Sequence, residues 1–169
     1  SLGFGGQCHM DPMVAMTIRD LPADYISLKS GINIMGHGSL NLRTYAANMI
    51  GMVRIIREKH EHTPIALVTP FSSPPRESTP NAVGMTLEIM REQTRDVYDR
   101  LVEAGDEHLV LCDGLSIVDG ESIAKYSDDG CHHNGDGIEE IGKRWIPEVM
   151  AKLGVPGAPA GTFRACGPR

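Results

Sequence analysis

The sequence predicts an α/β fold with a parallel sheet. Short, almost wholly apolar runs alternate along the chain with long segments of helical periodicity, which is typical of βαβ units. The chain has 169 residues, of which 41% are hydrophobic. That length and composition suit one globular domain with its own core. The expected strands lie in the apolar runs within residues 24–34, 64–70 and 108–114.

The first apolar run opens the segment Asp24–Ile34, which starts as a strand and ends in a glycine-rich turn. The stretch that follows has helical periodicity, and Ser39 or Asn41 is placed to cap the helix. The positions expected on its buried face are Leu42, Tyr45, Ala46, Met49, Ile50, Val53 and Ile56.

The second run, Pro64–Pro70, is short, continuous and bounded by prolines, as expected of a buried parallel strand. The segment Asn81–Gly105 has the pattern of an amphipathic helix, which its last glycine ends. The expected inner stripe of this helix is Val83, Leu87, Met90, Thr94, Val97, Leu101 and Val102.

The third run, HLVLCDG, predicts a strand in which Cys112 is buried. A last helix is expected from near Gly137 through Trp145, where Pro147 must kink or end it. The tail after Leu153 is rich in Gly, Ala and Pro and has no periodicity. We therefore expect one α/β domain over residues 1–153 and an extension over residues 154–169.

Composition narrows the classes of function. The formal net charge of −6 argues against nucleic acid or an anionic membrane surface as the main partner, and 5% aromatic residues argue against a base-stacking platform. No apolar run is long enough to span a bilayer, and the first residues lack a signal-peptide pattern. A cytoplasmic location is the default expectation, with secretion open if an upstream signal was removed. The four cysteines show no Cys-x-x-Cys spacing and read as isolated thiols.

Ligands of parallel sheets bind where strands lead into helices, so the loops after the expected strands are the places to look for a site. The loop SDDGCHHNGDG contains Asp129 and His132, and a carboxylate beside an imidazole is the orienting and basic pair of a hydrolytic triad. A solvated polar loop is the alternative that the spacing also allows. A metal site at His132 and His133 is a minor alternative, because zinc-ligand spacings are not met; we expect no metal.

Two further loops carry candidate polar groups. In LGFGGQ, glycines such as Gly6 would let backbone N–H groups face a ligand, although an ordinary tight turn fits as well. Asn33 follows a strand, where its amide could donate to an oxyanion or simply suit the turn. The proline-rich loop after the second strand is expected to wall a substrate pocket. In it, Arg76 and Glu77 are expected to form a structural ion pair, with contact to the substrate as the alternative. Its candidate substrate-pocket residues are Pro70, Phe71 and Arg76.

Taken in order, these motifs resemble those of the SGNH hydrolases, also called the GDSL esterase/lipase family. SLGFGG resembles the family's second sequence block, GINI the third, and DGCHHNGDG the fifth, and the resemblance runs from about Leu2 to about Leu153. Two positions depart from the family pattern: Ile34 stands in place of an Asp and His133 in place of a Pro. The resemblance implies a three-layer α/β/α fold of the flavodoxin type.

The resemblance also implies carboxylic-ester hydrolysis by Ser-His-Asp chemistry. In that scheme His132 is the base, Asp129 orients it, and Gly6 and Asn33 form the oxyanion hole, with no metal or organic cofactor. The expected substrate is a small ester, such as a short acyl ester or an acetylated sugar. An acyltransferase of the same fold, and a non-catalytic binding domain that has lost its serine, are the alternatives.

The family's nucleophile lies in a Gly-Asp-Ser motif at the end of the first strand, before the second block. No Gly-Asp-Ser occurs in this chain. We therefore expect the nucleophilic serine and the first strand of the sheet to lie in an N-terminal segment or domain outside this sequence. These 169 residues alone are expected to give little or no esterase turnover.

Overall fold

The computed structural model describes residues 3 and 5–159. Among these residues, three parallel strands form one sheet in the order β1, β2, β3. The strands are β1 (Ile26–Lys29), β2 (Ile65–Val68) and β3 (Leu109–Cys112). In register, Lys29 lies opposite Val68, and Val68 opposite Cys112. The predicted α/β class, the parallel sheet and all three strands are confirmed.

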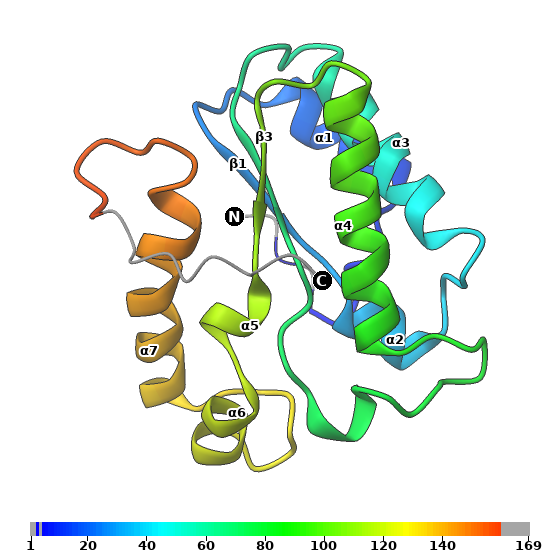
Figure 1. The fold of residues 1–169 in the computed structure, drawn as a ribbon, viewed down its shortest axis with the longest axis vertical. Helices are drawn as coiled ribbons and strands as arrows, with labels where there is room; N and C mark the ends of the chain where they lie inside the picture. Colours follow the sequence, from blue (N-terminus) through cyan, green and yellow to red (C-terminus); the bar gives the residue numbers. More distant parts are fainter. Residues whose placement is uncertain (1–2, 4, 160–169) are drawn as a thin grey trace.

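Helices cover both faces of the sheet (Figure 1). One face carries α1 (Pro12–Asp20), α3 (Tyr45–Arg57) and α4 (Leu87–Glu103), and the other carries α5 (Gly114–Ile117), α6 (Gly120–Tyr126) and α7 (Gly135–Trp145). The strands serve both layers because successive side chains point to opposite faces. Leu67 is buried in the first core and Val68 in the second. Each such side chain stabilises the fold by about 1.5–3 kcal/mol.

A short helix, α2 (Ile32–His37), follows β1 where the sequence predicted a glycine-rich turn. Gly31 precedes it with φ 138°, a conformation that disfavours a side chain. A Cβ at this position would also lie 2.6 Å from the Pro70 ring, so Gly31 lets the end of β1 approach the loop after β2. The chain therefore reverses at Gly31 instead of through a longer glycine-rich turn. Asn33 lies near the N-terminus of α2.

The helix predicted from Asn81 begins only at Leu87, where the Thr86 hydroxyl caps it by accepting from the Ile89 N–H. Asn81 instead closes a turn, because its Oδ1 accepts from the N–H groups of Val83 and Met85. Val83 is therefore exposed. Val102, the other predicted stripe residue that proves exposed, lies on the helix beside buried Leu101. The stripe positions that are buried are Leu87, Met90, Thr94, Val97 and Leu101.

The first predicted long helix, α3, starts after Leu42, which is 56% exposed and so does not belong to its buried face. Neither expected cap occupies the N-cap position, which is Thr44; Asn41 instead closes the turn before α3, where its Oδ1 accepts from the N–H groups of Arg43 and Thr44. The remaining predicted positions pack as expected. Tyr45, Met49, Val53 and Ile56 are buried, and Ala46 and Ile50 pack against them.

The last α-helix, α7, starts at Gly135 and ends at Trp145, two residues before Pro147. The chain continues as a π-helix over Ile146–Met150, so at Pro147 the α-helix changes to a π-helix and the chain stays helical. A 3₁₀ turn, Pro74–Arg76, lies in the loop after β2.

The expected boundary after Leu153 stays a prediction. Leu2, at the start of the resemblance, and residues 160–169 of the expected extension lie outside the described residues. Within the described part of the chain, no helix combines the length and the apolar character that a bilayer crossing requires.

Candidate active site

Asp129 and His132 form a hydrogen-bonded pair in the loop between α6 and α7. Nδ1 of His132 lies 2.6 Å from Oδ2 of Asp129. An ionised carboxylate can only accept, so Nδ1 carries a proton, and in the neutral imidazole Nε2 is then the nitrogen with the lone pair. The His132 side chain is 84% exposed, which leaves Nε2 open to a reacting group. The pair predicted from the spacing alone thus has the geometry of a base and its orienting carboxylate.

The backbone of the same loop holds the carboxylate in place. Oδ1 of Asp129 accepts from the N–H groups of Cys131, at 2.9 Å, and His132, at 2.7 Å. The hydrogen bond from the His132 side chain, followed by these backbone N–H groups, holds the pKa of Asp129 well below its usual range. Asp129 therefore stays ionised, which is the state that an orienting carboxylate needs.

The rest of this motif anchors the loop to α7. Asn134 caps the helix, with its Oδ1 accepting from the Gly137 N–H at 3.0 Å. A Cβ at Gly137 would come within 2.6 Å of Tyr126 and 2.9 Å of the His133 ring. The spacing DGCHHNGDG therefore encodes a carboxylate-closed turn, a helix cap and a tight helix start.

Asn33 and the loop of Gly6 lie together at the end of β1. Oδ1 of Asn33 accepts from the Cys8 N–H at 3.1 Å, and this bond fixes the side-chain amide. Its Nδ2 makes no hydrogen bond with any residue that the structure describes. Gly6, two residues before Cys8, is exposed and has φ 69°. The Asn33 amide and this glycine turn therefore lie near one another at the end of β1, and their oxyanion role stays a prediction.

The predicted pocket residues lie in the loop between β2 and α4, here called the wall loop (residues 70–80). The Phe71 ring lies under the Lys29 ammonium, with Nζ 4.4 Å from the ring centroid. Pro70 packs on Gly31. Arg76 donates from Nη1 to the Ser73 hydroxyl at 2.8 Å. Pro70 and Phe71 thus lie beside the end of β1, whereas Arg76 is engaged within its own loop.

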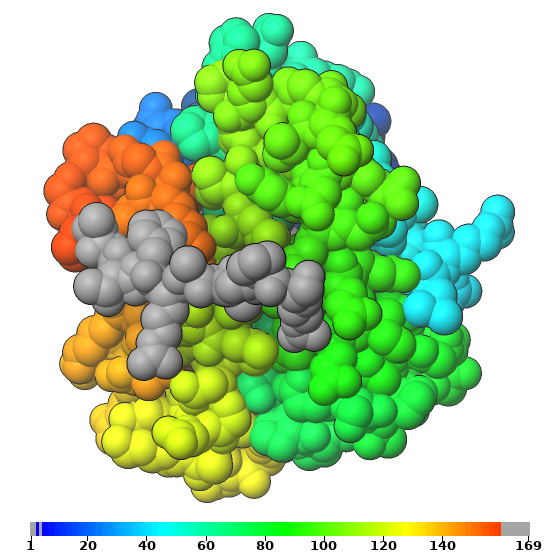
Figure 2. Space-filling model, in the orientation of Figure 1, coloured from blue at the N-terminus to red at the C-terminus, as the bar shows by residue number. Residues whose placement is uncertain are grey.

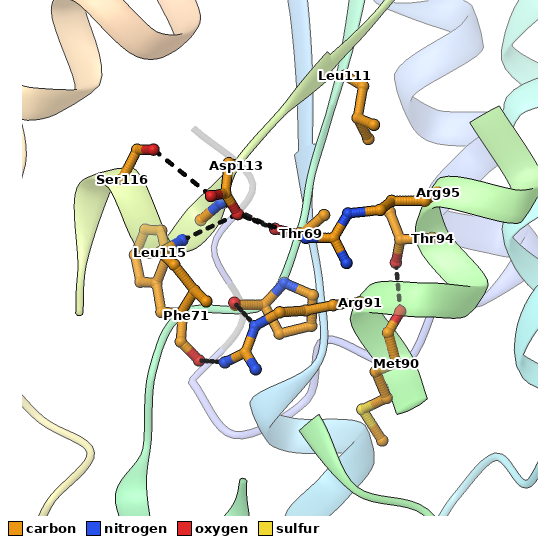
Figure 3. Close-up of polar contacts among 12 residues, drawn as sticks. Thr69, Phe71, Met90, Arg91, Thr94, Arg95, Leu111, Asp113, Leu115 and Ser116 are labelled. Atoms are coloured by element: carbon orange, nitrogen blue, oxygen red, sulfur yellow. Dashed lines mark hydrogen bonds and ion pairs between the residues drawn. The ribbon is translucent and has the colours of Figure 1, made fainter. Parts of the chain in front are cut away.

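The ion pair predicted between Arg76 and Glu77 is wrong. Glu77 pairs with Arg91 of α4, with Nη1 and Oε2 2.6 Å apart. Arg91 also donates to the carbonyls of Pro70, at 2.8 Å, and Phe71, at 3.0 Å (Figure 3). Arg91 can reach both ends of the wall loop because it lies on the inward side of α4, where it is 3% exposed.

The wall loop is joined directly to the loop of Asp129. The Ser73 hydroxyl donates to the Gly130 carbonyl at 2.7 Å. Figure 2 shows the corresponding segments, green for the wall loop and yellow for the loop before α7, side by side at the bottom of the view. Within the described residues no hydrogen bond joins His132 to Gly6 or Asn33, so the candidate site consists of two separate groups of residues. Lys29 interacts electrostatically with Cys8 beside one group and with Cys131 beside the other.

Lys29, Ser73 and Arg91 are residues that sequence reasoning did not assign to this region. Lys29 extends from the end of β1 toward Phe71, and its positive charge contributes, after burial, to lowering the pKa of His133. Arg91 could have been noticed because it occupies the buried side of an amphipathic helix, four residues after Leu87. Ser73 gave no signal, since serines are common in turns.

A cavity of about 470 Å³ runs along β1, on the side away from β2, and between α1 and α3. Its lining includes Cys8, Lys29 and Ser30 but neither Asp129 nor His132. Gly6 and Asn33 are not among its lining residues either, but Cys8, whose N–H binds Asn33, is. Within residues 3 and 5–159, no three His, Cys, Asp or Glu side chains converge as metal ligands.

Comparison of the sequence with protein-family models and with curated proteins gave no match. Solved structures do match. A salicylyl-acyltransferase, SsfX3, from a tetracycline biosynthetic pathway superposes with a TM-score of 0.78 and 34% identity, over 90% of this chain and 44% of that one. A GDSL-like lipase from Bacteroides ovatus gives a TM-score of 0.70 at 18% identity, over 88% and 41% of the two chains.

The chain has the SGNH-hydrolase fold. A carbohydrate esterase of family 3 from Talaromyces cellulolyticus shares this fold, with a TM-score of 0.61 and 14% identity over 83% of this chain and 64% of that one. This chain spans less than half the length of the acyltransferase and of the lipase. The predicted flavodoxin-like α/β class is thereby confirmed.

Proposed function

We propose that this chain is the acid–base and oxyanion part of a serine ester hydrolase, whose nucleophilic serine comes from a segment outside this sequence. The observation that carries the proposal is the contact between His132 Nδ1 and Asp129 Oδ2 at 2.6 Å, with Nε2 exposed. This arrangement leaves an oriented imidazole with an open lone pair. Asn33, its amide fixed by the Cys8 N–H, supports the second half of the proposal.

In the proposed reaction, the serine hydroxyl attacks an ester carbonyl while its proton passes to Nε2 of His132. The Asp129 carboxylate stabilises the imidazolium that forms. The oxyanion accepts from the Gly6 N–H and the Asn33 amide, and each such donor is worth about 3 kcal/mol in the transition state. The imidazolium then protonates the leaving alcohol, and water, activated in turn by His132, releases the acid and restores the serine.

The sheet supports a serine on a further strand beside β1. In the described residues, β1 pairs only with β2, and along its other edge the one backbone group with a hydrogen bond is the Lys29 carbonyl, which accepts from the Cys8 thiol. The cavity of about 470 Å³ lies along this edge and reaches Lys29 and Ser30 at the carboxyl end of β1. A parallel strand added there would place its own carboxyl end next to Asn33.

Acyl transfer is a second candidate. Its support is the 34% identity with a structure described as a salicylyl-acyltransferase. The acyl-enzyme would form as in hydrolysis, and an acceptor alcohol, deprotonated by Nε2 of His132, would take the place of water. The substrate on either route is a small ester whose acyl group lies beside Pro70 and Phe71.

Turnover by a protein extended upstream of Ser1 tests the proposal. We expect hydrolysis of p-nitrophenyl acetate by the extended protein and loss of at least about a thousandfold in kcat with His132→Ala. With an added alcohol, a transferase would give the new ester in preference to free acid. An upstream coding sequence without Gly-Asp-Ser, together with no turnover, would favour a non-catalytic binding domain and contradict the proposal.

A further inference from the structure

Ser73 connects the wall loop to the loop of Asp129 and His132. The residue is 1% exposed, and its hydroxyl bonds across to the second loop while its N–H and carbonyl bond within the wall loop. Its hydroxyl donates to the Gly130 carbonyl at 2.7 Å and accepts from Nη1 of Arg76 at 2.8 Å. Its N–H donates to Oε1 of Glu77 at 2.8 Å. A buried hydroxyl used in this way is a fixed link rather than a surface group.

The wall loop that carries Ser73 is itself fastened to α4. Arg91 holds the start of the loop through the carbonyls of Pro70 and Phe71, and its end through both carboxylate oxygens of Glu77. Burial would raise the pKa of Glu77, but the hydrogen bonds from Arg91 and Ser73 outweigh it, so the pKa lies below its usual value. The loop is thus anchored at two points of one rigid helix.

The acceptor of the Ser73 hydroxyl, the Gly130 carbonyl, lies inside the turn that brings Asp129 and His132 together. Gly130 follows Asp129 directly, and its φ of 69° turns the chain back so that Asp129 can accept from the N–H groups of Cys131 and His132. Pro75 of the wall loop packs against the same glycine, 3.5 Å from the position of a Cβ. The orientation of the Gly130 peptide therefore sets where the Asp129 carboxylate lies.

We propose that Ser73 is a positioning residue for the Asp129–His132 pair: by holding the Gly130 carbonyl on the anchored wall loop, it fixes the carboxylate against His132 Nδ1. This inference rests on the proposed function of the pair. Ser73 acts through Gly130, so its removal changes the geometry of the Asp129–His132 contact and the titration of Asp129, while both side chains stay in the chain.

NMR on the isotope-labelled chain tests this, with Ser73→Ala as the variant and Ser72→Ala as its matched control. Ser72 is the neighbouring buried serine, at 7% exposure, and its hydroxyl reaches Glu77 but not Gly130. In Ser73→Ala we expect the Asp129 carboxyl to titrate closer to an ordinary aspartate, and the His132 Nδ1 proton to exchange about three- to tenfold faster. Ser72→Ala should leave both signals as in the parent. Unchanged signals in Ser73→Ala, or equal changes in the two variants, overturn the proposal.

Ser73→Thr provides a rescue variant should the alanine variant fail to fold. The backbone at Ser73 is extended, with φ −149° and ψ 94°, which a β-branched residue adopts readily. The threonine hydroxyl keeps the link to Gly130, so the Asp129 titration should match the parent. A threonine variant that folds but titrates like an ordinary aspartate contradicts the proposal.

Kinetics of the upstream-extended protein separate this inference from the function on which it rests. Ser73→Ala is expected to lower kcat about three- to tenfold and to leave KM near the parent value. A change in KM alone would make Ser73 a pocket residue and overturn its positioning role. Undiminished turnover in His132→Ala would instead remove the proposed function, while the NMR result on the link between Ser73 and Gly130 would stand by itself.

Discussion

Arg91 of α4 pairs with Glu77, 14 residues earlier in the chain, and Arg76, the residue next to Glu77, does not take part. The pair closes the wall loop, because the same guanidinium also binds the two carbonyls where this loop leaves β2. Figure 3 shows Arg91 extending from α4 to the carbonyl of Phe71. The position of Phe71 beside Lys29 therefore depends on a residue of a distant helix.

Breaking this pair should destabilise the chain. Arg91→Met removes the cation that pairs with the partly buried Glu77 carboxylate and the guanidinium donors of the Pro70 and Phe71 carbonyls, and we expect the free energy of unfolding to fall by about 3 kcal/mol. Arg76→Met is the matched control: its guanidinium is less buried and bonds one hydroxyl, so a loss of about 1 kcal/mol or less is expected. Urea unfolding of both variants gives the comparison, and equal losses would show that Arg91 does not anchor the loop.

The pair of Asp129 and His132 should contribute to stability in a defined pH window. The pKa of Asp129 is lower in the folded chain than the unfolded value of about 3.9. Its contribution is therefore fully present above pH 3.9, about the unfolded value, and is lost as the pH falls through the folded pKa. Asp129→Asn should lower stability at neutral pH and converge with the parent in acid. Unfolding curves between about pH 2 and 7 measure this, and a constant difference would contradict it.

His133 should titrate below the ordinary histidine value of about 6.5. Burial is the main cause of its lowered pKa, and the positive charge of Lys29 adds to it. Lys29→Met removes that charge, so the titration midpoint of the His133 ring should move upward. Ring-proton NMR of the parent and the variant reports both midpoints; a parent midpoint above 6.5, or no upward change in Lys29→Met, would rule out this assignment.

Cys112 should react more slowly with alkylating agents than Cys131. Burial raises its pKa to about 12, and it lies in the middle of the second core. The reactive thiolate is therefore scarce at neutral pH. Cys131 lies half-buried in the loop of Asp129 and is expected to react first of the two. Timed alkylation with peptide mass spectrometry ranks them, and faster modification of Cys112 would mean that the core opens readily.

Local sequence patterns were sufficient to predict the three strands and the contact between Asp129 and His132. Apolar runs predict buried strands because both faces of the sheet are covered, and Asp129 reaches His132 through a turn of four residues. Both are short-range consequences of the chain itself. The same holds for the buried Cys112 of β3.

The features that the sequence did not predict are contacts with residues distant in the chain and the exact starts of helices. Glu77 was assigned to its neighbour Arg76 because Arg91 is brought near only by the packing of α4. Asn81 continues a helical pattern, but its side chain closes a turn before Thr86 caps α4. The helix α1 was not assigned, although Pro12 at its first turn is a start signal. Asn33 was expected in a turn, but the turn is completed at Gly31 and Asn33 lies in the helix that follows.

Labelling with a serine-reactive fluorophosphonate tests the central claim most directly, namely that this chain supplies the base while the nucleophile lies outside it. The 169-residue chain should take up no probe. A protein extended upstream to include Gly-Asp-Ser should be labelled once, and its His132→Ala variant far more slowly. Stoichiometric labelling of the 169 residues alone, or equal labelling rates with and without His132, would contradict the account.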